Sequence, residues 1–198
     1  MLFIFYFRSL RLKKLVWDYV FLVGLAAAII TLDQWTKELV RRNLQVGEIW
    51  SPWEALTPYA RIVHWKNSGA AFGILQGFGG IFMVLAIVVA IMIFVYFPQV
   101  PRRDWSLRIA LGLQLGGAVG NLIDRLIQGY VTDFISVGTF PVFNIADSSI
   151  SIGVAILALG IWLKDWRERQ QLPEPGDESA SSGEELPAEA SSEGQHGG

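Results

Sequence analysis

Long apolar runs separated by short polar segments dominate the pattern of this chain. Four such runs extend over about residues 15–32, 70–97, 105–123 and 143–163. A helix needs roughly 20 predominantly apolar residues, each rising about 1.5 Å, to cross a bilayer. The second run has residues to spare, whereas the other three reach this length by including polar residues at one end. The pattern therefore predicts four transmembrane helices.

Polar residues lie at one end of every apolar run. They are Asp33, Asn67, Asn121, Asp124, Asn144 and Asp147. Ten Lys and Arg residues flank the run ends on the side that carries both termini, and six flank the other ends. Because cytoplasmic segments carry the excess of Lys and Arg, this bias predicts that both termini are cytoplasmic. The polar ends are then expected to lie together near the outer face of the membrane.

The segments outside the runs predict smaller elements. Residues 36–44 have the pattern of a short amphipathic helix on the membrane surface, and residues 49–65 mix prolines with β-forming residues, as in a small sheet. A basic segment, residues 1–14, precedes a membrane domain of residues 15–168. Residues 169–198 are rich in Ser, Glu, Gly, Pro and Ala, so they cannot bury a core and are expected to be disordered.

The first apolar run has an alternative interpretation. A basic stretch, an apolar run and three consecutive alanines at 26–28 are also the pattern of a secretory signal peptide. Its removal would leave three spans and would discard Asp33. We therefore interpret this run as the first transmembrane helix.

The composition supports a membrane protein and narrows its chemistry. Of 198 residues, 52% are hydrophobic and only 17% are charged, below the share of about 25% in soluble domains. The net charge of −2 arises in residues 171–198, which hold seven acids and no Lys or Arg, so the rest of the chain carries +5. A basic body suits anionic lipid at the cytoplasmic face. It has no basic stripe with interleaved aromatic residues, which argues against nucleic acid as a partner.

Few residues of the usual metal-binding and nucleophilic types are present. The chain has no cysteine, which excludes disulfides, thiolate chemistry and Cys-based metal sites. Its two histidines are His64, expected in a loop, and His196, in the tail, and they are too few and too distant for a His-built metal site. We therefore expect neither a metal nor a cofactor.

Three acids in the last outer region are the strongest candidates for chemistry, because ionisable groups at membrane depth are costly and are functional by default. Asp124 precedes Arg125, which favours an ion pair or a cap at the end of the third span. Asp133 lies in an apolar, strand-like stretch at 130–135 without an adjacent base. Asp147 begins the fourth span, where a carboxylate is a favourable helix cap.

Asp133 and Asp147 have the spacing of a carboxylate pair. They are fourteen residues apart, and Gly138 and Pro141 between them allow the chain to fold back. Two close carboxylates cannot both ionise fully, so one keeps a proton while the other acts as a base, as in aspartic proteases. Such a pair activates water without a metal, Ser or Cys. Spacing alone leaves open which of the three acids meet.

Several other polar residues and a set of glycines have two interpretations each. Asn67, Asn121 and Asn144 are either buried structural hydrogen-bonding residues or residues that position a substrate backbone. Asp33 and Lys37, four residues apart, are expected to pair on a helix. Three glycines form a small-residue face on the third span, which is typical of close helix packing; they are Gly116, Gly117 and Gly120.

Five sequence blocks, in this order along four spans, resemble the bacterial lipoprotein signal peptidases, also called signal peptidase II. The blocks are Asp33–Lys37 (DQWTK), Asn67–Gly73 (NSGAAFG), Gly116–Arg125 (GGAVGNLIDR), Val131–Ile135 (VTDFI) and Phe143–Ser148 (FNIADS). The resemblance implies an aspartic endopeptidase of the membrane. It also implies an all-α membrane fold of four transmembrane helices, with a small extracytoplasmic β cradle and a short amphipathic surface helix.

The resemblance also assigns roles to the polar residues. It implies that Asp133 and Asp147 are catalytic and that Asp124, with Arg125, supports them. The other matched positions support the site or contact substrate; they are Asp33, Lys37, Asn67, Asn121 and Asn144. The implied substrate is a diacylglyceryl-modified prolipoprotein, cleaved just before the lipidated cysteine. The implied location is the bacterial cytoplasmic membrane, with lipid as the surrounding partner.

Two other classes of protein fit the same intramembrane acids. One is a small transporter coupled to protons or cations, but its polar residues should follow a whole path, and here they gather at one end. Four spans without an inverted repeat also argue against it. The other is a membrane assembly factor in which the acids are structural.

Overall fold

The computed structural model describes residues 2–69 and 78–171. The chain divides into two compact units, Met1–Ile161 and Trp162–Gly198. The first unit holds the sheet, three complete helices and the beginning of the fourth, and the site discussed below lies entirely within it. The predicted tail falls outside the described residues from residue 172 onward, while residues 169–171 still belong to the last helix.

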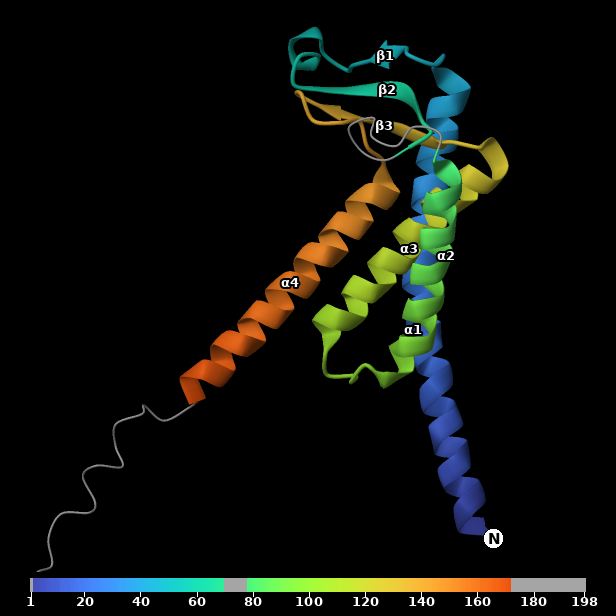
Figure 1. The fold of residues 1–198 in the computed structure, drawn as a ribbon, viewed down its shortest axis with the longest axis vertical. Helices are drawn as coiled ribbons and strands as arrows, with labels where there is room; N and C mark the ends of the chain where they lie inside the picture. Colours follow the sequence, from blue (N-terminus) through green and yellow to red (C-terminus); the bar gives the residue numbers. More distant parts are fainter. Residues whose placement is uncertain (1, 70–77, 172–198) are drawn as a thin grey trace, which may run out of the picture. The chain divides into compact units, whose positions relative to one another are not determined.

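The prediction of four transmembrane helices is confirmed. Each long helix contains a stretch that is long and apolar enough to cross a membrane. The helices are α1 (Leu2–Asn43), α2 (Gly79–Tyr96), α3 (Trp105–Gln128) and α4 (Ile145–Gln171) (Figure 1). Residues 70–77, predicted to begin the second span, lie outside the described residues. Short 3-10 helices, η1 (Glu54–Leu56) and η3 (Phe97–Gln99), lie in two of the connections.

The first helix differs from the sequence prediction. The separate surface helix predicted for residues 36–44 is not observed, because α1 continues without a break to Asn43. No Pro or Gly interrupts residues 25–46, and Lys37 pairs with Asp33 one turn earlier at 2.8 Å. The helix ends at Asn43, and the chain turns at Gly47, whose φ of 86° suits a residue without a side chain.

A small antiparallel sheet caps one end of the helices, as predicted. It has the order β1 (Ile49–Trp50), β2 (Ala60–Asn67), β3 (Val131–Val137). In the register of the central pair, Trp65 lies opposite Asp133. His64, expected in a loop, lies instead in β2, where its buried ring Nδ1 is 2.8 Å from the main-chain oxygen of Leu44.

The chain folds back after β3, as the turn residues predict. Gly138 has a φ of 51°, and its N–H donates to the main-chain oxygen of Tyr59 at 2.8 Å. Beyond the turn, Phe143 and Ile135 exchange main-chain hydrogen bonds of 3.0 and 2.8 Å. This pairing places Asn144 and the start of α4 next to Asp133.

Small residues on α3 allow its neighbours to approach closely, as predicted. A side-chain Cβ added to Gly116 would lie 2.7 Å from the Cβ of Ile29 in α1. One added to Gly117 would overlap the main-chain oxygen of Ala146 in α4, and one added to Gly120 would lie 2.8 Å from Asp33 Oδ2. Glycine at these positions therefore brings α1 and the start of α4 onto α3.

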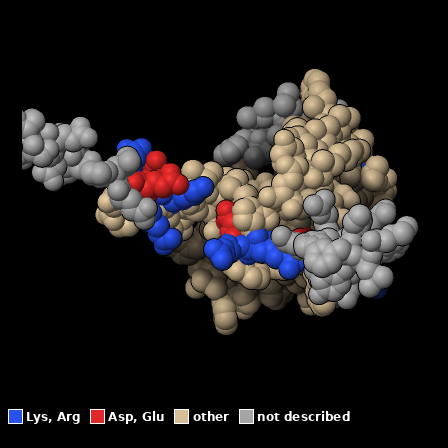
Figure 2. All heavy atoms as spheres, turned by 90° about the horizontal axis from the view of Figure 1, so that it is seen from below, with Lys and Arg blue, Asp and Glu red and all other residues tan. Residues whose placement is uncertain are grey.

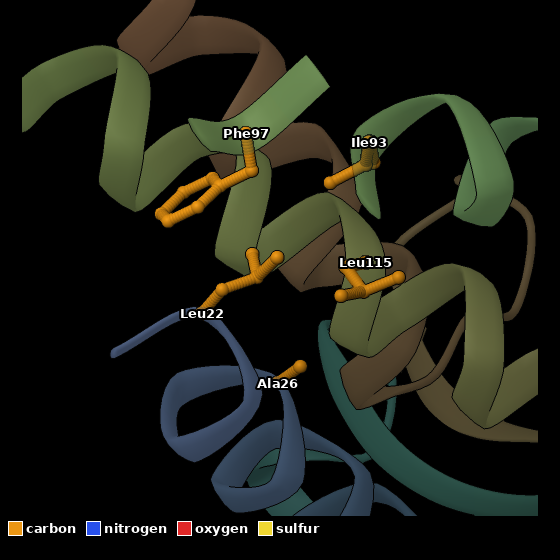
Figure 3. Close-up of a cluster of buried hydrophobic side chains, with 5 residues drawn as sticks. All are labelled: Leu22, Ala26, Ile93, Phe97 and Leu115. Atoms are coloured by element: carbon orange, nitrogen blue, oxygen red, sulfur yellow. The ribbon is translucent and has the colours of Figure 1, made fainter. Parts of the chain in front are cut away.

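Away from the sheet, the helices are held by an apolar cluster and a buried ion pair. The cluster consists of Leu22, Ala26, Ile93, Phe97 and Leu115, whose side chains converge between α1, α3 and the end of α2 (Figure 3). Beside it, Asp18 accepts hydrogen bonds of 2.9 Å from both Arg102 and Arg108. The guanidinium of Arg108 stacks over Phe97 at 4.5 Å. The face away from the sheet shows basic side chains grouped beside carboxylates (Figure 2).

Candidate active site

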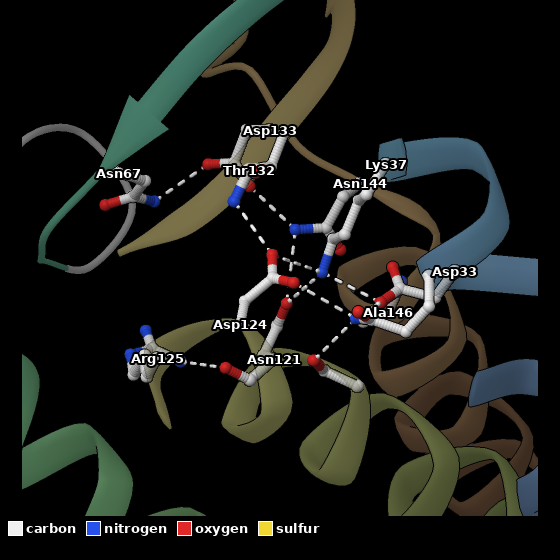
Figure 4. Close-up of polar contacts among 12 residues, drawn as sticks. Asp33, Lys37, Asn67, Asn121, Asp124, Arg125, Thr132, Asp133, Asn144 and Ala146 are labelled. Carbon is white, nitrogen blue, oxygen red and sulfur yellow. Dashed lines mark hydrogen bonds and ion pairs between the residues drawn. The ribbon is translucent and has the colours of Figure 1, made fainter. Parts of the chain in front are cut away.

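The polar residues predicted from the sequence meet where α1, α3, β3 and the start of α4 converge (Figure 4). Hydrogen bonds and ion pairs connect all nine into one cluster. They are Asp33 and Lys37 of α1, Asn67 of β2, Asn121, Asp124 and Arg125 of α3, Asp133 of β3, Asn144, and Asp147 of α4.

Asp133 is buried on the strand β3, with only 1% of its surface exposed. Its carboxylate accepts one hydrogen bond from Asn67 Nδ2 at 2.9 Å and one from Asn144 Nδ2 at 2.7 Å. Both donors are neutral amides, so no cation contacts this carboxylate among the described side chains. Burial, reinforced by the charge of Asp147, raises the pKa of Asp133 from 3.8 to about 7, although the two amide hydrogen bonds oppose the rise.

Asp147 is part of a reciprocal cap at the start of α4. The side-chain oxygen of Asn144 accepts from the main-chain N–H of Asp147 at 2.9 Å, and Asp147 Oδ2 accepts from the main-chain N–H of Asn144 at 3.2 Å. This is the capping-box arrangement, with Asn144 at the cap and Asp147 three residues later. The expectation of a cap at this position is thus fulfilled by the pair, and one oxygen of Asp147 remains for other partners.

Asn121 connects this cap to the charged residues behind it. Its Nδ2 donates to Asp147 Oδ1 at 2.7 Å, while its Oδ1 accepts from Lys37 Nζ at 3.0 Å and Asn144 Nδ2 at 3.2 Å. Because the amide oxygen faces two donors, the amide nitrogen is fixed toward Asp147. Asn144 therefore touches both candidate catalytic carboxylates, and Asn121 orients one of them.

A buried ion cluster supports these amides from α1. Lys37 is fully buried and lies 2.8 Å from Asp33 and 3.1 Å from Asp124, which confirms the predicted pairing of Asp33 with Lys37. The second oxygen of Asp33 accepts from the main-chain N–H of Ala146 at 2.9 Å. This bond ties α1 to the first turn of α4, where unpaired N–H groups attract a carboxylate.

Asp124 pairs with residues of α1 and not with the adjacent Arg125. It lies 3.6 Å from Arg41 as well as near Lys37, and it accepts from the main-chain N–H of Thr132 at 2.9 Å. Consecutive residues of a helix point about 100° apart, so Arg125 faces elsewhere. Arg125 donates to the main-chain oxygens of Asn121 and Gly69, at 3.4 Å each.

Comparison with known proteins identifies the family. The model of the signal peptidase II family matches residues 25–163. The chain belongs to the signal peptidase II family. It is 40% identical over 150 residues to the lipoprotein signal peptidase of Halalkalibacterium halodurans, covering 74% of this chain and 94% of the relative. It is 43% identical over 147 residues to that of Shouchella clausii, covering 73% and 95%. It is therefore a membrane peptidase.

Solved structures of bacterial membrane enzymes have the same fold as this chain. One, determined at 2.3 Å resolution, superimposes with a TM-score of 0.69 at 31% identity and covers 77% of this chain and 93% of that chain. Another, at 1.9 Å, gives 0.63 at 31% identity, covering 71% and 91%. The similarity extends over most of the four-helix architecture and its sheet.

The polar cluster also contains two residues that were not predicted from the sequence. Gln34 Nε2 lies 3.1 Å from both Asp33 and Asp124, and Arg41 Nη1 lies 3.2 Å from the hydroxyl of Thr132. Arg41 could have been found, because it follows Lys37 by four residues on the same helix face. The prediction of a separate helix on the membrane surface for residues 36–44 did not place Arg41 in the cluster.

A cavity of about 510 Å³ is lined by Asp147 and by Asn67, a hydrogen-bond partner of Asp133. Asn67, Asn121, Arg125 and Asp147 form its polar side. Its other side is apolar and includes Phe140, Val142, Phe143, Ile150 and Ile152. The described part of the chain contains no group of three or more His, Cys, Asp or Glu side chains placed to hold a metal ion. The cavity thus joins an apolar surface to acidic and amide groups.

Proposed function

We propose that this chain removes signal peptides from prolipoproteins with Asp133 and Asp147 as a catalytic pair. The observation that carries the proposal is the position of Asn144 between the two carboxylates. Its Nδ2 donates to Asp133 at 2.7 Å, and its main-chain N–H donates to Asp147 at 3.2 Å. One residue therefore fixes both carboxylates, and the cavity is lined by Asp147 and by Asn67, the other hydrogen-bond partner of Asp133.

In this mechanism Asp133 holds a proton and Asp147 is ionised. A pKa of about 7 keeps Asp133 protonated in much of the protein at neutral pH. Asp147 accepts a proton from water, whose oxygen attacks the peptide carbonyl carbon, while Asp133 gives its proton to the carbonyl oxygen. The intermediate then collapses, the peptide nitrogen takes a proton from Asp147, and the C–N bond breaks. The proton of the new carboxyl oxygen returns to Asp133, so one water is consumed.

The charges of the cluster agree with a pair that shares one proton. Four carboxylates lie in it, from Asp33, Asp124, Asp133 and Asp147. Three cations balance them: Lys37 and Arg41 form ion pairs, and Arg125 is close enough for its charge to act on them. One proton held by the pair leaves three negative and three positive charges. A neutral cluster is favourable where water is scarce.

The surroundings of the cavity suit a lipid-modified substrate. Its apolar side, which includes Phe140 and Ile152, continues toward the exposed apolar surface of α4, where side chains such as Val154 face outward. A diacylglyceryl group on the cysteine after the cleaved bond would keep its acyl chains in lipid while the peptide enters the cavity. We propose that the substrate is the diacylglyceryl-modified prolipoprotein, cleaved before that cysteine.

The distribution of Lys and Arg supports a multi-pass arrangement in the bacterial cytoplasmic membrane with both termini in the cytoplasm. The catalytic pair then lies near the outer face. In this arrangement residues 1–14 form a basic cytoplasmic segment, residues 15–168 form the catalytic domain, and residues 169–198 form an acidic cytoplasmic tail.

The proposal is tested by incubating the purified protein in detergent with a diacylglyceryl-modified prolipoprotein. The unmodified precursor and the Asp133→Asn protein are the controls. Cleavage of the modified substrate alone, lost in the variant, is the expected result. Equal cleavage of both precursors would contradict the lipid requirement. Full activity of a folded Asp133→Asn protein would overturn the catalytic assignment, and a folded wild type without any cleavage would favour the transporter or assembly interpretations.

A further inference from the structure

Gln114 of α3 has a buried amide nitrogen that the described residues leave without a hydrogen-bond partner. It lies on the face of the helix that also carries Ala118, Asn121 and Arg125. Seven residues separate it from Asn121, which is about 10 Å along the helix axis at a rise of about 1.5 Å per residue. An unpaired amide donor at this depth in a membrane is unfavourable, because no water replaces the missing acceptor.

The surroundings of Gln114 are arranged to hold its side chain. A Cβ added to Gly153 of α4 would lie 3.1 Å from Gln114 Cγ, so the glycine leaves room for the stem of the glutamine between the two helices. The nearby hydroxyl of Ser149 is satisfied, with bonds of 3.2 Å to the oxygen of Leu113 and 2.8 Å to that of Ala146. Gln114 is thus held in place but has an unused donor.

Gln114 lines a second cavity, of about 340 Å³, between α2, α3 and α4. Its other walls are apolar and include Phe82, Leu85 and Val89 of α2. The cavity continues toward the catalytic pair, because Asn121, Arg125 and Ile150 line both cavities. An apolar chain segment lying here would reach the catalytic carboxylates at its end.

We infer that Gln114 binds a main-chain carbonyl oxygen at the end of the apolar helix of the substrate's signal peptide. This inference rests on the proposed function. Signal peptides contain an apolar region of about 7–15 residues before the cleavage site. Inside a membrane such a region is helical, and the last four carbonyl groups of a helix have no partner within it. The substrate therefore brings unpaired acceptors to a groove that contains an unpaired donor.

The distance between Gln114 and the catalytic pair agrees with this assignment. A peptide bond must be extended to lie between two carboxylates, so the helix of the substrate has to end before the cleavage site. About 10 Å corresponds to roughly three extended residues at about 3.3 Å each. The last helical turn would then lie at the depth of Gln114. A neutral amide suits this depth better than Lys or Arg, because it meets a carbonyl without burying a charge.

The first test compares two substrates with the same diacylglyceryl-cysteine. One is the full prolipoprotein, and the other is a peptide that starts three residues before the cysteine and lacks the apolar helix. Gln114→Leu should raise KM for the full substrate about tenfold, the equivalent of about 1.4 kcal/mol, without changing kcat. It should leave the short peptide unaffected. Gln128→Leu, a matched change at an exposed position of α3, should affect neither substrate.

The second test identifies the acceptor itself. Single amide-to-ester replacements in the last helical turn of the signal peptide weaken one carbonyl acceptor at a time. One replacement should raise KM in the wild type and have no further effect in Gln114→Leu, as a double-mutant cycle requires for a direct contact. Gln114→Met, which keeps the length of the side chain, replaces Gln114→Leu if that variant does not fold.

Three results separate the possible failures. If the wild type cleaves neither substrate, the proposed function itself is wrong. If the wild type cleaves both and Gln114→Leu and Gln114→Met change neither KM, Gln114 does not bind the substrate. An equal rise of KM for the full and the short substrate would place the effect on the lipid or on the helix packing, and it would overturn the assignment to the signal helix.

Discussion

Two buried aspartates at opposite ends of α3 have opposite kinds of partners. Asp18, 4% exposed, accepts from two guanidinium groups at 2.9 Å each, and one of them is itself packed on Phe97. Asp133, 1% exposed, accepts from the amides of Asn67 and Asn144. Both carboxylates are hydrogen-bonded, but among the described residues only Asp18 has cations in direct contact.

The difference separates a structural carboxylate from the one to which we assign a catalytic role. The cations around Asp18 bind α1 to the start of α3 and to the connection before it, so that removing Arg108 leaves the buried carboxylate with Arg102 alone, which is half exposed. Amides satisfy the hydrogen-bonding capacity of Asp133 without neutralising its charge, so protonation remains accessible near neutral pH. The same residue type thus performs two tasks, and its donors decide which.

The largest expected effect is on the proposed catalytic pair, Asp133 and Asp147. Asp133→Asn or Asp147→Asn should lower kcat by about a thousandfold or more, because an amide can neither accept the proton of water nor return one. The protein should remain folded, since the amide keeps the size of the carboxyl group. Cleavage of the lipidated prolipoprotein and the unfolding temperature, measured on the same preparations, check this. A variant that is inactive only because it is unfolded would not support the assignment.

Asp133→Asn should also be more stable than the wild type at pH 8. The pKa of Asp133 is about 7 in the folded protein and 3.8 without the fold, so ionisation of this group destabilises the fold increasingly as pH rises from about 4 to 7. The asparagine carries no such charge. A rise in unfolding temperature at pH 8 that disappears near pH 4 is expected, and a uniform loss of stability at both pH values would contradict it.

The structural aspartate should show the reverse pattern. Arg108→Leu should lower the free energy of unfolding by roughly 3 kcal/mol, because Asp18 stays buried with one of its partners removed. The kcat of the protein that remains folded should not change. The double variant Asp18→Leu with Arg108→Leu should recover most of the stability. Thermal unfolding in detergent measures the first effect, and loss of kcat without loss of stability would contradict the comparison.

A smaller effect on stability is expected at Asp124, which pairs with cations as Asp18 does but lies in the same cluster as Asp133. Asp124→Asn removes one of two carboxylates from the fully buried Lys37 and should lower the stability by about 1–3 kcal/mol. We expect kcat to change less than tenfold, because Asp124 touches neither carboxylate of the pair. Glu38→Gln, next to Lys37 on α1, is a matched control, because the Glu38 side chain is 44% exposed and its ion pairs should contribute less than about 1 kcal/mol.

The pH dependence should follow the raised pKa of Asp133. Because the mechanism needs Asp133 protonated, kcat/KM should fall above pH 7, by about tenfold per pH unit once the proton is lost. Rates measured from pH 5 to pH 9 on a substrate without titratable groups near the cleavage site check this. A flat profile up to pH 9 would show that the proton of Asp133 takes no part.

The smallest expected effect is a shift of that profile. The hydrogen bond from Asn67 stabilises the ionised form of Asp133, so Asn67→Leu should raise its pKa further. The fall in kcat/KM should then move to higher pH, by less than about one unit since one hydrogen bond is lost. Asn43→Leu, at an exposed position, is the matched control. A shift to lower pH would contradict the role given to Asn67.

Elements with a periodic or local signal could be predicted from the sequence. The four spans follow from apolar length, and the pairing of Asp33 with Lys37 follows from helical spacing. The fold-back after β3 follows from its turn residues, with Gly138 at a positive φ. Each of these features is determined by residues that are close together in the sequence.

Contacts between distant elements could not be predicted in the same way. The sequence predicts an ion pair with Arg125 or a cap at the end of the third span for Asp124, but its ion-pair partners come from α1, more than eighty residues earlier. His64 was placed in a loop, because an eight-residue strand with mixed burial has little alternation to detect. Asp18 and Arg108 are each a lone charge within an apolar run, but nothing in the neighbouring sequence shows that they form an ion pair.

The cap between Asn144 and Asp147 links the chemistry of this peptidase to its biogenesis. Synthesis proceeds from the N-terminus, so Asp33, Asn67 and Asp133 are made before residues 144–147 exist. The second carboxylate and the amide that joins the pair are supplied together, when the last helix begins and docks through Ala146 onto Asp33. Under the proposed mechanism, a nascent chain with three inserted helices lacks one member of the catalytic pair, so hydrolysis would start only after the fourth helix has formed.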